Sequence, residues 1–211
     1  MRASELIDPA ARQHLEAVVA EAERETGGEI VVAVVRACDE YGAVGWRLGV
    51  ALAAATFLAL GWFVAPLPWT GYLAAQGAAL AIGHAIGRIE AVRRRLLPAA
   101  LVEQRVAQRA RRCFAEEGLT RTRGRTGILI FVALLEHRVV VLADEGIDRV
   151  LDPDESWRQV VDLAVAGLRE GRAVEGLEAA VRRCGEILGR HLPAQVPNPD
   201  ELSNRLVVLE D

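Results

Sequence analysis

The hydropathy pattern is dominated by one long apolar stretch in the first half of the chain. No Asp, Glu, Lys or Arg lies between residues 48 and 87. Pro66 and Pro68 divide this stretch into two parts of about 20 residues, each long enough to span the hydrocarbon layer of a bilayer as a helix. The pattern predicts a hairpin of two transmembrane helices, at about 46–65 and 69–89.

The residues that flank the apolar stretch predict its orientation. Trp46, Trp62 and Trp69 lie near its margins, as expected for side chains at headgroup depth. Arginines gather beyond its outer ends, at Arg36, Arg47, Arg88, Arg93, Arg94 and Arg95. Because positive residues favour the cytoplasmic side, both termini and the soluble parts are expected to face the cytoplasm, and the lipid bilayer is an expected partner.

Outside the hairpin, helical and strand periodicities alternate along the chain. Asp8 followed by Pro9 is a helix start, and Gly118 is a helix stop. A tight turn at 135–137 separates two runs rich in β-branched residues. The elements expected are helix 8–25, strand 30–35, a long helix 90–117, strands 128–134 and 138–143, and helices 154–170 and 172–191.

This order predicts an α/β protein, a three-layer α/β/α sandwich with a small mixed sheet, interrupted by the transmembrane hairpin. Strand 30–35 is apolar on both faces and should be central, parallel to 128–134 through a right-handed crossover, with 138–143 antiparallel. The expected parts are a first domain segment at 1–41, the hairpin at 42–89, a second domain segment at 90–192 and a tail at 193–211.

The same topology gathers several charged residues at the sheet edge farthest from the hairpin. This distal edge comprises Glu29, Arg125, Thr126, Asp144 and Glu145, and it is the candidate site. Arg121, Arg123 and Arg125 form a loop that could bind an anion such as phosphate. Alternatively, these are strand-end and loop charges that are solvated independently.

Composition excludes several other chemistries. The net charge of −4 gives no support to a nucleic-acid partner. Cys38, Cys113 and Cys184 lie far apart without a CxxC pair, so they are expected to be reduced thiols within the structure. No serine lies in a GxSxG turn, and the four histidines lack metal-ligand spacing, so no metal site is predicted from the residues.

Several short motifs, in order, resemble the TPM domain, a family named after a thylakoid lumen protein, a photosystem II repair protein and a levamisole-receptor modulator. They are TGGEIVV at 26–32, GL at 118–119, RTGILI at 125–130, EHR at 136–138, ADEGI at 143–147, Trp157 and DELSN at 200–204. The chain looks like the bacterial membrane-anchored branch of that family. The resemblance implies an α/β/α sandwich, a role beside membrane protein complexes, and calcium binding or acid phosphatase activity in some relatives.

One departure from the family bears on calcium. Relatives that bind calcium carry an Asp-Asn-Gly turn, whereas this chain has Arg125, Thr126 and Gly127 at the matching positions. A guanidinium in place of a carboxylate removes a hard oxygen ligand and adds positive charge, which argues against a calcium cofactor. The hypothesis is that Arg125 instead pairs with Glu29 or Asp144.

Two main functions, and a third that ranks last, remain after this reasoning. The first is a membrane-anchored binding, assembly or maintenance module for membrane protein complexes, with another membrane protein as partner and no nucleic acid. The alternative is a membrane-bound phosphatase of low activity, a hydrolase in which the arginine loop would hold the phosphate. A hairpin that itself carries the function, with the soluble domain regulating it, ranks last, since no charged residue lies between residues 48 and 87 to mark a transport path.

Overall fold

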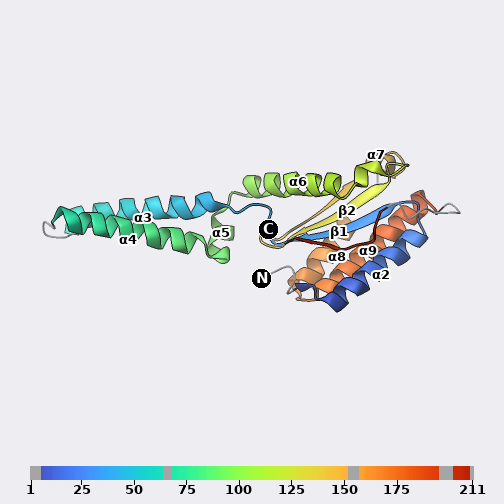
Figure 1. Cartoon of the computed structure of the whole chain (residues 1–211), viewed down its shortest axis with the longest axis horizontal. Helices are drawn as coiled ribbons and strands as arrows, with labels where there is room; N and C mark the ends of the chain where they lie inside the picture. Colours follow the sequence, from blue (N-terminus) through green and yellow to red (C-terminus); the bar gives the residue numbers. More distant parts are fainter. Residues whose placement is uncertain (1–5, 64–67, 152–156, 195–201, 210–211) are drawn as a thin grey trace. The chain divides into compact units, whose positions relative to one another are not determined.

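A computed structural model of the chain describes residues 6–63, 68–151, 157–194 and 202–209. It divides into two compact units, one made of residues 1–38 with 103–211 and the other of residues 39–102. We call them the sheet unit and the hairpin unit (Figure 1). Residues 66 and 67 of the predicted hairpin turn, the start of helix 154–170 and part of the tail lie outside the described residues.

A mixed four-stranded sheet forms the centre of the sheet unit. Its strands are β1 (Glu29–Val35), β2 (Gly127–Ala133), β3 (Arg138–Ala143) and β4 (Val207–Leu209), in the order β3-β2-β1-β4. β1 runs parallel to β2 and β4, and β3 runs antiparallel to β2. All residues of β1 and β2 are buried, which confirms the prediction of an α/β fold with a small mixed sheet and a central first strand.

Helices cover both faces of this sheet. The helices α2 (Pro9–Arg24), α8 (Arg158–Arg169) and α9 (Ala173–His191) lie on one face, and α6 (Ala99–Glu116) lies on the other (Figure 1). Ile30 and Ile128 point into the core beneath the three-helix layer, together with Leu15 and Leu177. Because both faces are covered, the two central strands can be apolar on both sides, apart from Glu29 at the start of β1.

Local signals set the ends of these elements as expected. The Asp8 carboxylate accepts a hydrogen bond from the backbone N of Ala11 at 2.7 Å, which caps α2 at its start. Gly118 takes the left-handed conformation, with φ of 76°, two residues after the last residue of α6. The single turn η1 (Leu119–Arg121) then leads toward β2.

The predicted continuous helix over 90–117 is wrong. The structure has two helices, α5 (Glu90–Leu96) and α6, separated by Leu97 and Pro98. Leu97 is extended, with φ of −75° and ψ of 128°. Proline disfavours the helical conformation in the residue before it, so the chain leaves the helix at this point.

The hairpin unit contains α3 (Gly42–Phe63) and α4 (Trp69–Gly87), packed side by side and followed by α5. Glycines allow the two long helices to approach closely. A Cβ built on Gly83 would lie 2.6 Å from the Cα of Gly49, and one on Gly87 would overlap Gly45. This pairing makes α3 and α4 antiparallel neighbours.

Among the described residues, one helical segment, Gly42–Trp62, is long and apolar enough to cross a membrane. The companion helix α4 is also free of Asp, Glu, Lys and Arg, but it contains Gln76 and His84. The structure therefore contains the two packed helices that were predicted for the hairpin. One of the two, α3, has the length and composition of a membrane span.

Candidate functional site

The distal edge is assembled by the register of three strands. Glu29 pairs with Gly127 where β1 and β2 begin, and Ala143 pairs with Ile128 where β3 ends. Glu29 is the first residue of β1, Thr126 directly precedes β2, and Asp144 directly follows β3. These three residues therefore lie at the same end of the sheet. The structure brings together the residues that the sequence placed there.

Threonine hydroxyls organise the loop before β2. The Thr122 hydroxyl accepts a hydrogen bond from the backbone N of Thr126 at 2.9 Å. The Thr126 hydroxyl donates to the carbonyl of Gly27 at 2.9 Å, and the Thr126 carbonyl accepts from the backbone N of Glu29 at 3.1 Å. Thr126 thus joins the entries to β1 and β2, and its role is to position the backbone.

An ion pair between Arg125 and Asp144 occupies the middle of this edge. Arg125 Nε lies 3.0 Å from Asp144 Oδ2, and the Asp144 side chain is only 6% exposed. Its other oxygen, Oδ1, accepts from the backbone N of Glu145 at 2.9 Å and caps α7 (Glu145–Asp148). Of the two partners considered for Arg125, the structure pairs it with Asp144.

Further contacts hold Arg125 in this position. Its Nη1 donates to the carbonyl of Thr120 at 3.2 Å, and its Nη2 lies 3.8 Å from Glu145 Oε1. The backbone N of Gly146 donates to the Arg125 carbonyl at 2.9 Å. A Cβ on Gly146 would overlap the carbonyls of Gly124 and Arg125, so only glycine allows α7 to pack this closely on the loop.

Glu29 lies at the same edge with a different contact. Its side chain is buried, and Oε2 accepts a hydrogen bond from the backbone N of Leu202 at 3.2 Å. This bond fixes the chain segment that leads to β4. Glu29 therefore helps to hold the C-terminal segment against the sheet.

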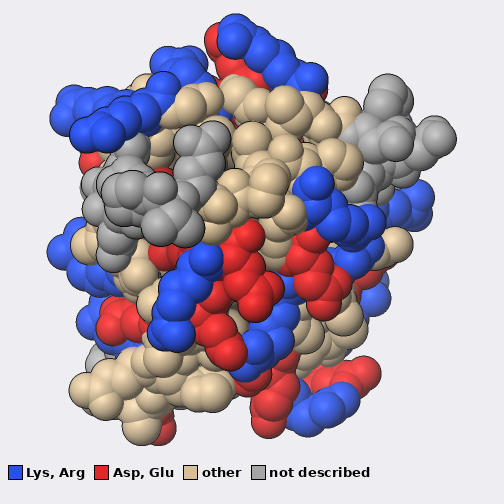
Figure 2. Space-filling model, turned by 90° about the vertical axis from the view of Figure 1, so that its right-hand side faces the viewer, with Lys and Arg blue, Asp and Glu red and all other residues tan. Residues whose placement is uncertain are grey.

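The arginine loop is exposed but does not form a separate basic surface. Arg121, Arg123 and Arg125 are all exposed, and Arg125 is engaged by Asp144. Viewed from the end that carries α7, acidic and basic side chains are intermixed (Figure 2). Across the described part of the chain, no group of three His, Cys, Asp or Glu side chains could hold a metal ion.

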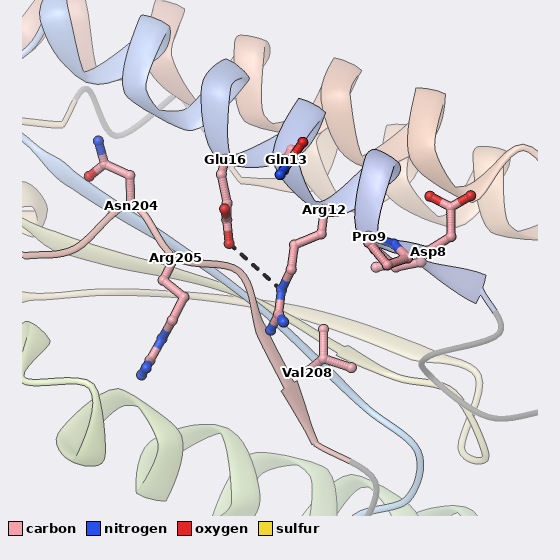
Figure 3. Close-up of a pocket in the computed structure, with 9 residues that line it drawn as sticks. Asp8, Pro9, Arg12, Gln13, Glu16, Asn204, Arg205 and Val208 are labelled. Carbon is pink, nitrogen blue, oxygen red and sulfur yellow. Dashed lines mark ion pairs between the residues drawn. The ribbon is translucent and has the colours of Figure 1, made fainter.

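The structure also contains a groove that the sequence did not indicate. It lies between α2 and the segment leading into β4, has a volume of about 740 Å³, and is shown in Figure 3. Arg12 Nη2 donates to the Leu206 carbonyl at 2.8 Å, and Glu16 Oε1 accepts from the backbone N of Leu206 at 3.1 Å. The groove went unpredicted because its second wall belongs to the tail, whose short strand has no turn signal around it.

These features define a class of protein: an α/β domain with a mixed four-stranded sheet, whose sequence is interrupted by a helical hairpin between its first strand and α6. Residues 95–187 match the family model described as the TPM domain. Over these residues the chain matches the TPM-domain family, in agreement with the motifs found there from residue 118 to residue 157.

A solved structure supports the fold. The NMR structure of the BA42 protein from the psychrophilic bacterium Bizionia argentinensis aligns with a TM-score of 0.58 and 17% identity, covering 95% of this chain and 94% of that one. At this identity the likeness concerns the fold alone. No curated protein matches the chain.

Proposed function

We propose that this protein is a membrane-anchored TPM-domain module that binds, assembles or maintains a complex of membrane proteins. The hairpin unit carries the proposal, because its surface is apolar. Large side chains on both helices are exposed within the chain, among them Trp62 on α3 at 83% and Trp69 on α4 at 73%. Exposed apolar surface of this extent is suited to lipid rather than to water.

The composition of α4 is compatible with a second span. Its two strongly polar side chains are turned toward the helix pair: Gln76 Nε2 and His84 Nδ1 are buried atoms. The His84 ring lies 4.8 Å from the ring of Trp46 on α3, measured between centroids. Lipid would then meet mainly the apolar side chains of α4, such as Leu73 and Ile82, which are exposed.

Arginine placement favours an orientation with both termini in the cytoplasm of a bacterial cell. Arg47, Arg88 and Arg93–Arg95 all lie at one end of the hairpin, and the opposite turn has no positive residue. A hairpin returns the chain to the side from which it entered. The sheet unit can then be completed from both flanking segments on one side of the membrane.

Binding is favoured over catalysis by the state of the distal edge. The buried carboxylate of Asp144 is neutralised by Arg125 and also caps a helix, so it is poorly placed to act as a base or a ligand. The partner proposed is another membrane protein. Affinity capture from solubilised membranes should recover a specific partner, and a metal-supplemented phosphate-release assay on the same sample should show no turnover that depends on Asp144.

Two experiments test the anchoring. Alkaline carbonate extraction should leave the protein in the membrane pellet, and its appearance in the soluble fraction would defeat the proposal. For the orientation, one cysteine at a time would be added to a Cys38→Ser background, in which Cys113 and Cys184 are both buried, at Thr70, near the hairpin turn, or at Arg158, in the sheet unit. An impermeant maleimide should label the Thr70→Cys variant in intact cells and the Arg158→Cys variant only after permeabilisation.

A further inference from the structure

The short helix α5 is amphipathic and has no buried residue. Val92 and Leu96 lie four residues apart on one side of α5, and Ile89 directly precedes the helix; Ile89 and Leu96 are 53% and 48% exposed. Helices of this length are unstable in water without packing against other elements. An apolar side open to the surroundings, directly after an apolar hairpin helix, is typical of a helix that lies in a membrane interface.

Arginines surround this apolar side at the same end of the hairpin. Arg88, Arg94 and Arg95 are exposed on and beside α5, and Arg47 is exposed on α3. The close approach of Gly45 to Gly87 places that part of α3 at the level where α4 ends. Residues 39–102 contain five arginines and three carboxylates, a net charge of +2 within a chain whose net charge is −4.

Arg93 fixes α5 across the base of the hairpin. Its Nη1 donates to the carbonyl of Glu40 at 3.0 Å, and its Nη2 donates to the carbonyl of Arg88 at 3.1 Å. These bonds join the segment before α3 to the end of α4. The position of the neighbouring arginines is therefore set by the fold of the hairpin unit.

We propose that α5 and the arginines around it, Arg47, Arg88, Arg94 and Arg95, form a binding surface for the phosphate groups of anionic lipids. This inference rests on the proposed membrane anchoring and adds lipid selectivity to it. The planar guanidinium presents paired donors that match phosphate oxygens. Basic residues beside a membrane span are each stabilised by an anionic leaflet, whereas a zwitterionic leaflet gives no net attraction.

The test uses the full chain in a neutral detergent, titrated with phosphatidylglycerol or with phosphatidylcholine, with bound lipids counted by native mass spectrometry. Wild-type protein should bind phosphatidylglycerol more tightly. In the Arg88→Gln/Arg95→Gln variant this preference should fall roughly twenty- to thirty-fold, the loss expected for two juxtamembrane basic residues. The matched control, Arg158→Gln/Arg169→Gln, removes two exposed arginines from α8 and should retain the preference.

Equal affinity of the wild-type protein for the two lipids would overturn the inference, as would an equal loss in the control. Carbonate extraction of the same variants separates this result from the anchoring itself. A variant that stays in the membrane pellet while losing its preference supports the arginine surface. Wild-type protein that stays in the pellet without any preference refutes the surface and leaves the anchoring intact.

Discussion

At the scale of single residues, Arg125 combines an unfavourable backbone with favourable contacts. Its φ of 56° is in the left-handed region, which costs a residue with a Cβ about 1–2 kcal/mol. The backbone N of Arg125 donates to the Thr122 carbonyl at 3.0 Å, and its side chain neutralises the buried Asp144. The ion pair and the loop bonds together hold this conformation.

Two substitutions separate the backbone from the side chain. Arg125→Ala should lower the free energy of unfolding, because it removes the partner of a buried carboxylate and keeps the strained φ. Arg125→Gly loses the same partner but relieves the strain, so it should be more stable than Arg125→Ala by about 1 kcal/mol. Thermal unfolding of both variants in detergent measures the difference, and equal stabilities would contradict this account of the turn.

The three thiols should differ in reactivity. Burial, with Glu117 adding to it, raises the pKa of Cys113 to about 11, and burial also raises the pKa of Cys184. Cys38 is partly exposed. At pH 8, iodoacetamide should therefore modify Cys38 alone in the folded protein, as judged by peptide mass spectrometry.

The raised pKa of Cys113 predicts that the stability of the fold depends on pH in the alkaline range. A protonated Cys113 thiol favours the folded state fully below its ordinary pKa of about 9.0, and this contribution is lost as the pH rises through about 11. Stability should fall between these values by more in the wild type than in Cys113→Ala. Rapid labelling of Cys113 at pH 8 would show that the thiol is not shielded.

At the scale of elements, the hairpin unit is held together by backbone contact between α3 and α4. Gly45 and Gly49 face Gly87 and Gly83 at four-residue spacing. In lipid, helices associate through such close packing, because apolar side chains gain little by leaving the hydrocarbon. These glycines already contact each other within one chain, so they are not available for pairing with a second copy of the protein.

A matched pair of substitutions on α4 tests this packing. Gly83→Leu inserts a side chain against the backbone of Gly49 and should destabilise the hairpin by about 1–3 kcal/mol. Gly77→Leu introduces the same side chain where nothing lies within 4 Å, so it should have little effect. Limited proteolysis in detergent provides the measurement, and equal sensitivity of the two variants would rule out the glycine interface.

At the scale of the whole chain, the C-terminal segment that contains β4 binds β1 and α2, two elements from the N-terminal part of the sequence. β4 pairs with β1 from Ala33 to Val35, and the carbonyl of Leu209 accepts from the backbone N of Arg36 at 3.0 Å. Arg12 on α2 donates to the backbone carbonyl of Leu206, and Glu16 accepts from the backbone N of Leu206. The edge of β1 is thereby covered, which protects it from pairing with another chain.

Leu206 should be the main apolar contact of this closure, because it is only 2% exposed. Leu206→Ala should lower the free energy of unfolding by about 2–4 kcal/mol and increase aggregation on heating. Val208→Ala, at a partly exposed position of β4 two residues further on, should cost clearly less. Thermal unfolding followed by light scattering checks both, and equal losses would argue against a buried anchor at Leu206.

Sequence by itself determined the elements whose signals are local. Asp8 and Pro9 begin α2, Gly118 ends α6, and the uniform apolar runs of β1 and β2 require cover on both faces. The two helices of the hairpin could be predicted because the apolar stretch and the prolines that divide it are also local signals. Pro98 was also present in the sequence, and its effect on Leu97 explains why one long helix was the wrong prediction.

Only the tertiary structure decided the features that depend on residues far apart in the chain. β4 has only three residues, which is too short to be predicted from a sequence pattern. It forms because Arg12, Glu16 and Glu29 bind the segment before it. The choice of Asp144 over Glu29 as the partner of Arg125 follows from the position of α7 on the loop, which Gly146 permits. Local periodicity encodes helices and strands, whereas these pairings depend on how separate elements pack.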